Sequence, residues 1–98
     1  MNGERLDATV RGMVQGVGFR VFVVDAAQAL HVRGWVADER DGVVRVVAEG
    51  DRPSLERLLA ELHRGPISAL VEHVSSTWMP ATGEFGGFSI RSSWHGGD

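Results

Sequence analysis

The sequence predicts an α+β protein, a ferredoxin-like βαββαβ sandwich with a short extra C-terminal strand. Apolar and polar residues alternate near the start of the chain, which is typical of a half-buried strand. Two later segments carry apolar residues at helical spacing, and short β-type segments lie between and after them. Two crossovers of helical length that return to the same sheet predict an antiparallel sheet with both helices on one face.

The first strand and the first helix are separated by a glycine-containing loop. Alternating apolar residues predict the strand over residues 6–14, and two glycines predict a tight loop over residues 15–18. From Phe19 onward, apolar residues recur at i, i+3, i+4, i+7, i+8 and i+11, which places them on one face of a helix. We expect this helix to end near His31.

The middle of the chain is expected to form a hairpin. Residues 32–37 predict the second strand, and residues 43–49 predict the strand that returns beside it. The turn between them covers residues 38–42, where the Asp41-Gly42 pair is a strong hairpin signal.

The second helix is expected to open at Pro53 or Ser54 and to end at the Gly65-Pro66 pair. Its buried stripe consists of leucines at helical spacing, namely Leu55, Leu58, Leu59 and Leu62. The rest of the chain predicts a fourth strand, a loop and a short last strand, over residues 70–79, 80–87 and 88–91.

The length of 98 residues predicts a single domain, because a chain of this size has enough apolar residues for one core only. We expect the core to cover about residues 6–91 and the tails, residues 1–5 and 92–98, to be loose. Within the second tail, Trp94 is a candidate to pack back on the body.

Composition excludes several classes of protein. The sequence has no cysteine, which rules out disulfides, thiolate nucleophiles and cysteine-type zinc sites. A net charge of -3 argues against sequence-independent nucleic-acid binding, which needs a broad basic surface. The longest apolar run, residues 21–24, is far too short to cross a membrane, and the N-terminus lacks the pattern of a signal peptide. We expect a cytoplasmic monomer that binds neither nucleic acid nor membranes.

The loop before the first helix is the most informative segment for function. Its glycines allow close approach of a ligand, and the N–H groups at a helix N-terminus favour an anion. Arg20 adds a planar, permanently charged fork that binds a phosphate through two parallel hydrogen bonds. A phosphate cradle is therefore one interpretation, formed by Gln15, Gly16, Val17, Gly18, Phe19 and Arg20. The alternative is that the glycines merely shape a turn and that Arg20 is a solvated helix residue.

Three motifs in this order resemble the acylphosphatase family. The motifs are Gly12-x-Val14-Gln15-Gly16-Val17-Gly18-Phe19-Arg20, Gly34-Trp35-Val36 and Asp41-Gly42-x-Val44. The similarity continues to the end of the predicted sheet, through Ala48-Glu49-Gly50, Gly65-Pro66 and Phe88-x-Ile90. It covers nearly the whole chain.

The resemblance implies an enzyme that hydrolyses small acyl phosphates to a carboxylate and inorganic phosphate without a metal or cofactor. It also implies that Arg20 and the loop amides hold the phosphate. The carboxylate leaving group has a conjugate-acid pKa of about 4, so it departs without a general acid. Positioning and charge stabilisation then suffice for catalysis.

Position 38 departs from the family pattern. The resemblance implies a water-orienting asparagine one residue after the segment that ends at Ala37, and Asp38 stands there instead. An ionised aspartate accepts hydrogen bonds but donates none, and it places a negative charge beside the phosphate. Asp38 is also a suitable residue to open a turn. The efficiency of hydrolysis is therefore the property that this substitution puts in question.

Two alternatives to an efficient hydrolase stay open from the sequence. One is a catalytically weak or inactive anion-binding or interaction domain of the same fold, which keeps the cradle and has lost the water site. The other is the acylphosphatase-like N-terminal domain of hydrogenase maturation proteins that transfer carbamoyl groups, which is normally part of a much longer chain.

The remaining polar residues suggest no second site. The histidines, at positions 31, 63, 73 and 95, show no metal-ligand spacing, so we expect no bound metal. Ser75, Ser76 and Thr77 lack the nucleophile elbow and the adjacent base that a nucleophilic serine needs. We interpret them as strand residues.

Overall fold

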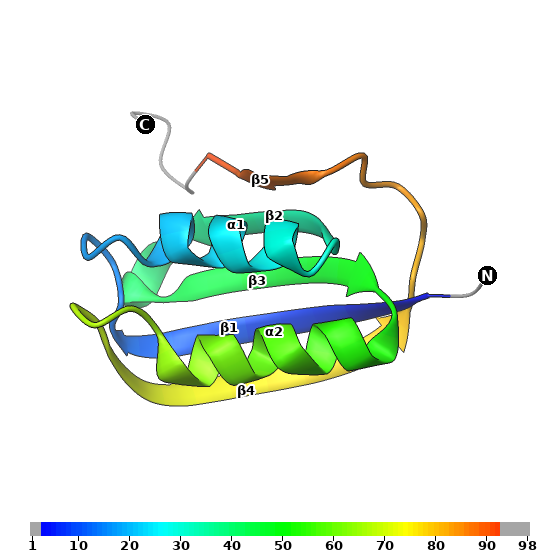
Figure 1. Ribbon diagram of the computed structural model, residues 1–98. Coiled ribbons are helices and arrows are strands. Elements are labelled where there is room, and N and C mark those ends of the chain that lie inside the picture. The colour runs from blue at the N-terminus through cyan, green and yellow to red at the C-terminus, as the bar shows by residue number, and fades with distance from the viewer. Residues whose placement is uncertain (1–2, 93–98) are drawn as a thin grey trace.

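The computed structural model describes residues 3–92, which form five strands, two α-helices and one short 3-10 helix. The elements follow in the order β1 (Glu4–Met13), α1 (Phe19–Ala29), β2 (Arg33–Asp38), η1 (Arg40–Gly42), β3 (Val44–Gly50), α2 (Arg52–Arg64), β4 (Leu70–Pro80) and β5 (Phe88–Ile90). This order confirms the predicted βαββαβ arrangement with an extra strand at the end (Figure 1).

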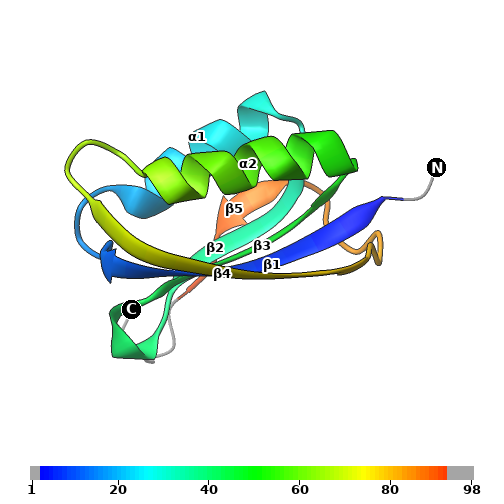
Figure 2. The same ribbon diagram turned by 90° about the horizontal axis from the view of Figure 1, so that it is seen from below.

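The strands form one sheet in the order β4-β1-β3-β2-β5. The pairs β1–β4, β1–β3 and β2–β3 are antiparallel, whereas β5 runs parallel to β2, with Val36 opposite Ile90. Both α-helices lie on one face of the sheet, as Figure 2 shows. The position and direction of β5 were not part of the prediction, and they bring the end of the described chain beside α1.

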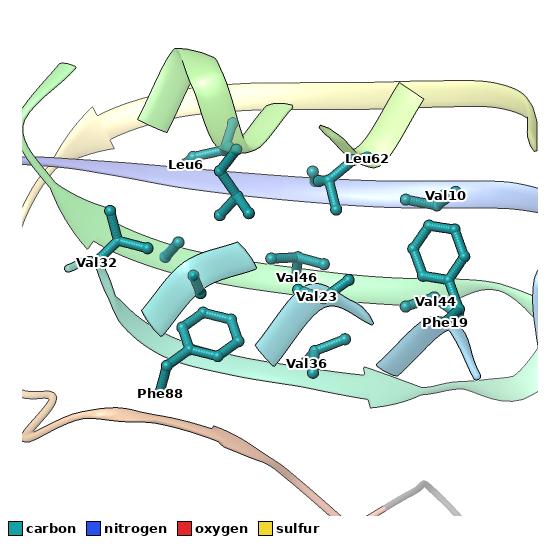
Figure 3. Close-up of a cluster of buried hydrophobic side chains, with 14 of the residues drawn as sticks. Leu6, Val10, Phe19, Val23, Val32, Val36, Val44, Val46, Leu62 and Phe88 are labelled. Atoms are coloured by element: carbon teal, nitrogen blue, oxygen red, sulfur yellow. The ribbon is translucent and has the colours of Figure 1, made fainter. Parts of the chain in front are cut away.

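The core lies between the helices and the covered face of the sheet (Figure 3). Burial alternates along β1, so that Leu6, Ala8 and Val10 are fully buried on the helix side. Each helix contributes one apolar stripe, with Phe19, Val23 and Ala27 from α1 and Leu55, Leu58 and Leu62 from α2. The sequence pattern identified both stripes, because side chains three and four residues apart share one face of a helix.

Some boundaries differ from the predicted ones. β1 begins at Glu4, so Glu4 and Arg5 belong to the sheet rather than to a loose tail. Both residues pair with β3 and with β4. α2 begins at Arg52, because the Asp51 side chain accepts a hydrogen bond from the Ser54 N–H and caps the helix. The suggested packing of Trp94 lies outside the described residues.

Residues 3–92 include no helix that has both the length and the hydropathy of a membrane span.

Candidate active site

The loop between β1 and α1 has the backbone conformation that a glycine-rich cradle needs. Gly16 and Gly18 have φ angles of 75° and 80°, in the left-handed region that other residues rarely adopt. Gly18 is the N-cap of α1 and offers no side chain, and the Phe22 N–H donates the first helical bond to the Gly18 carbonyl. The N–H groups before Phe22 have no earlier helical carbonyl to pair with, so this end of α1 favours a negatively charged ligand.

Arg20 and Asp38 meet at this end of the molecule. Arg20 is the second residue of α1, and Asp38 is the last residue of β2. The Arg20 Nε lies 3.3 Å from the Asp38 Oδ2, with the arginine side chain 39% exposed and the aspartate side chain 15% exposed. The two residues that the sequence analysis singled out for chemistry therefore form an ion pair at the mouth of the loop.

A small cavity of about 80 Å³ lies between the loop, α1, β2 and β5. Its lining consists of Val14, Gly16, Gly18, Phe19, Arg20, Val21, Asp38 and Ile90. Most of the predicted cradle thus surrounds one space, although the Phe19 side chain is in the core and leaves only its backbone for a ligand. Arg20 contributes the positive charge of this lining and Asp38 the negative charge.

Gln15 and Val17 do not line this cavity, and their described contacts tie the loop to its neighbours. The Gln15 side-chain amide donates to the Glu39 and Val43 carbonyls, both at 2.8 Å, and so holds the turn that follows Asp38. On the other side, the Ser68 hydroxyl donates to the Val17 carbonyl at 2.7 Å. These contacts hold the cradle between the β2–β3 turn and the α2–β4 loop.

Three residues at or beside this site were not predicted from the sequence: Val21, Ile90 and Ser68. Val21 follows Arg20 directly, but it does not belong to the apolar face of α1, so the helical pattern assigned it no role. Ile90 was part of the Phe88-x-Ile90 similarity, yet only the pairing of β5 with β2 places it beside the cavity. Ser68 carries no local signal in the sequence.

No group of three or more histidine, cysteine, aspartate or glutamate side chains within residues 3–92 is arranged to hold a metal ion. Ser75, Ser76 and Thr77 lie on β4, at the opposite edge of the sheet from β5, where they pair with residues 7–9 of β1.

Comparisons with known proteins identify the family to which this chain belongs. The family model "Acylphosphatase" matches residues 6–90. A curated acylphosphatase of Salinibacter ruber is 47% identical over 88 residues, which cover 90% of this chain and 93% of that protein. The crystal structure of an acylphosphatase from Bacillus subtilis superposes with a TM-score of 0.87 at 33% identity, covering 90% of this chain and 98% of that chain.

The fold is also similar to part of a longer protein. The crystal structure of full-length HypF in its phosphate- and nucleotide-bound form matches with a TM-score of 0.85 at 25% identity. The match covers 95% of this chain and only 12% of HypF. The matches to the two acylphosphatases, in contrast, cover nearly the whole length of those proteins. With a family model that spans residues 6–90 and curated relatives that match almost end to end, the chain belongs to the acylphosphatase family.

Proposed function

We propose that this protein hydrolyses acyl phosphates to a carboxylate and inorganic phosphate, with Arg20 and the N–H groups of residues 15–19 as the phosphate site. Curated acylphosphatases that are 44% and 47% identical over most of the chain support this activity. The observation that carries the assignment of residues is the shared cavity, in which Arg20, two left-handed glycines and the start of α1 face one another. A dianionic phosphoryl group matches that combination of charge and donors.

In the proposed reaction, a water oxygen forms a new bond to phosphorus while the bond from phosphorus to the acyl oxygen breaks. The electron pair of that bond leaves with the carboxylate, and the water proton passes to the phosphate product or to solvent. Charge builds up on the phosphoryl oxygens and on the leaving carboxylate, and preorganised donors stabilise it without a cofactor. The Arg20 guanidinium and the backbone N–H groups of residues 15–19 supply such donors.

Asp38 would limit the rate of this reaction. Its carboxylate already pairs with Arg20, so a phosphate held by the same guanidinium lies beside a second negative charge. The carboxylate is able to accept a hydrogen bond from the attacking water, but it has no N–H to offer the phosphate. We therefore assign Asp38 to the water position and expect slower turnover than with an asparagine there.

We also propose that residues 1–98 form a single domain that acts as a monomer in the cytoplasm. The shared hydrophobic core of both helices and the sheet supports a single domain. The absence of cysteine from the sequence fits a reducing compartment.

Two measurements test the proposed function. The first is the release of inorganic phosphate from benzoyl phosphate, against a buffer blank and against the Arg20→Lys variant. The second is an NMR titration of the wild type with inorganic phosphate, which we expect to move the amide signals of Gly16 and Gly18 most. Hydrolysis no faster than the blank would reject the enzyme, and small uniform shifts over the whole surface would reject the cradle.

A further inference from the structure

Two exposed apolar side chains stand at the mouth of the phosphate cavity. Val21 is 57% exposed and follows Arg20 in the first turn of α1, and Ile90 is 44% exposed at the end of β5. Both line the same cavity as Arg20 and Asp38. Within residues 3–92 only three other large hydrophobic side chains are exposed, namely Met13, Ile67 and Leu70, and none of those lines this cavity.

The size of the cavity decides which part of a substrate meets these side chains. Its volume of about 80 Å³ is well below the 300 Å³ or so at which pockets begin to enclose a whole small molecule. The loop amides and Arg20 line this small space, so the phosphoryl group occupies it. The acyl group must then extend through the mouth, where Val21 and Ile90 offer carbon surface from two different elements.

Charge at the mouth also selects the acyl group. Arg20 is the cation of the lining, and in the proposed function its positive charge is used by the phosphate. An acyl group that carries a free carboxylate would bring that negative charge near Asp38, and no positive charge would be left in the lining to offset the repulsion. An uncharged, apolar acyl group meets no such repulsion and covers the exposed surface of Val21 and Ile90.

We infer that Val21 and Ile90 form an acyl subsite and that this enzyme prefers acyl phosphates with an uncharged aromatic or branched aliphatic acyl group. The inference rests on the proposed function, because it takes the phosphate position as given. Val21 and Ile90 are specificity residues in this assignment: they contact the acyl group and take no part in breaking the bond to phosphorus.

The test compares substrates that share the phosphoryl group and differ in the acyl group. We expect kcat/KM of the wild type to fall from benzoyl phosphate to acetyl phosphate to succinyl phosphate. Val21→Thr replaces a methyl group by a hydroxyl and Ile90→Thr replaces an ethyl group by a hydroxyl, and in both variants we expect the ratio of benzoyl to acetyl phosphate to drop. Burying one methylene group changes kcat/KM about fourfold, so each variant should lower the ratio of benzoyl to acetyl phosphate about 3- to 5-fold.

The matched control is Ile67→Thr, the same change at a fully exposed isoleucine in the loop between α2 and β4. This variant should leave the ratio unchanged. A ratio that stays constant in Val21→Thr and Ile90→Thr, or a wild type that prefers succinyl phosphate, would overturn the acyl subsite while hydrolysis itself continues.

Binding of unreactive analogues separates this inference from the proposed function. Benzoylphosphonate and acetylphosphonate are titrated by NMR into the wild type and the same variants. Tighter binding of the benzoyl compound that depends on Val21 and Ile90 supports the subsite even if turnover is not detected, in which case only the proposed hydrolysis fails. Equal binding of the two phosphonates by the wild type rejects the subsite whatever the activity.

Discussion

Two ion pairs between an arginine and a carboxylate lie at opposite ends of the sheet, and they differ in their N–O distance and in the exposure of their side chains. Figure 1 shows the cradle at one end, where α1 begins, and the crossover between β4 and β5 at the other. At the crossover end, the Arg5 Nε lies 2.7 Å from the Glu49 Oε2, with side chains that are 18% and 6% exposed. At the cradle end, Arg20 and Asp38 are 3.3 Å apart and 39% and 15% exposed.

The Glu49 carboxylate accepts several hydrogen bonds. Besides Arg5, it accepts hydrogen bonds from the Thr82 N–H, the Thr82 hydroxyl and the Gly83 N–H. Burial by itself would raise the pKa of Glu49, but the hydrogen bonds from Thr82, Gly83 and Arg5 outweigh it and lower the pKa to about 2. This pair therefore holds the crossover against the sheet, and the crossover leads into β5 and Ile90.

The comparison shows how one chemical pair serves two purposes. A short, buried pair with several added hydrogen bonds stabilises the fold, because breaking it leaves a buried charge without partners. A longer pair with a more exposed arginine holds its guanidinium less firmly, so a phosphate is able to compete for it. Geometry and exposure, rather than residue type, distinguish the structural pair from the site pair.

The largest effect is expected from Arg20→Lys. Lysine keeps the charge but loses the planar pair of donors, and removal of one such donor from a charge-stabilising site costs about 10²- to 10³-fold in rate. We expect kcat/KM for benzoyl phosphate to fall by that factor, while thermal unfolding stays close to the wild type. The same substitution at the other pair, Arg5→Lys, should lower stability and leave phosphate affinity unchanged. Unchanged kcat/KM in folded Arg20→Lys would remove the arginine from the mechanism.

Glu49→Gln should mainly destabilise the fold. The lowering of this pKa from the ordinary 4.5 to about 2, reduced for screening by nearby solvent, corresponds to about 1–2 kcal/mol of stability near neutral pH. We expect a loss of about that size in the free energy of unfolding, measured by urea denaturation at pH 7. The affinity for inorganic phosphate should change little, because Glu49 and Arg20 lie at opposite ends of the sheet.

The same carboxylate predicts a pH dependence of stability. Because the pKa of Glu49 is lowered in the folded state, its contribution is complete above pH 4.5 and is lost as the pH falls toward 2. The difference in unfolding free energy between the wild type and Glu49→Gln should therefore shrink over this range. A difference that stays constant down to pH 2 would contradict the assigned role of the carboxylate.

Asp38→Asn should raise activity. Two like charges about 4 Å apart repel by roughly 4 kcal/mol at an effective dielectric near 20, an upper guide for a site that salt screens. A third of that repulsion corresponds to about tenfold in rate, which is the increase in kcat/KM that we expect for benzoyl phosphate. The asparagine also adds an N–H donor beside the phosphate.

The control for this variant is Asp7→Asn, which removes the same charge from a carboxylate that pairs with Arg45. Its activity should match the wild type. Equal or lower activity of Asp38→Asn would show that the aspartate is a working substitute for the asparagine of the family pattern.

The smallest effect is expected from Ser68→Ala. Loss of the hydrogen bond to the Val17 carbonyl loosens one side of the cradle, and a bond of this kind contributes about 1 kcal/mol. We expect a two- to fivefold weaker affinity for inorganic phosphate, measured by NMR titration, and a similar loss in kcat/KM. Ser68→Thr keeps the hydroxyl and should recover most of both. Wild-type affinity in Ser68→Ala would mean that this bond does not position the loop.

Local patterns in the sequence determined the order of the elements and one side of the site. The alternation of β1, the stripes of the two helices and the glycines before Phe19 depend on neighbours along the chain, so their spacing alone indicates strand, helix and loop. Arg20 follows the loop directly, and its place at the helix start is therefore visible in the sequence. The resemblance to a family then supplied the chemistry and drew attention to Asp38.

The resemblance placed Asp38 near the phosphate, but only the tertiary structure shows which side chains surround Arg20. Asp38 contacts Arg20 because the last residue of β2 lies beside the first turn of α1 in space. Ile90 lines the same cavity because β5 pairs with β2 in parallel. The hydrogen bond from the Gln15 amide to the turn after β2 and the one from the Thr82 N–H to Glu49 also join segments far apart in sequence. Such contacts depend on the pairing and register of whole strands, which a single sequence does not encode in any local pattern, so the composition of the site emerged only when the sheet was assembled.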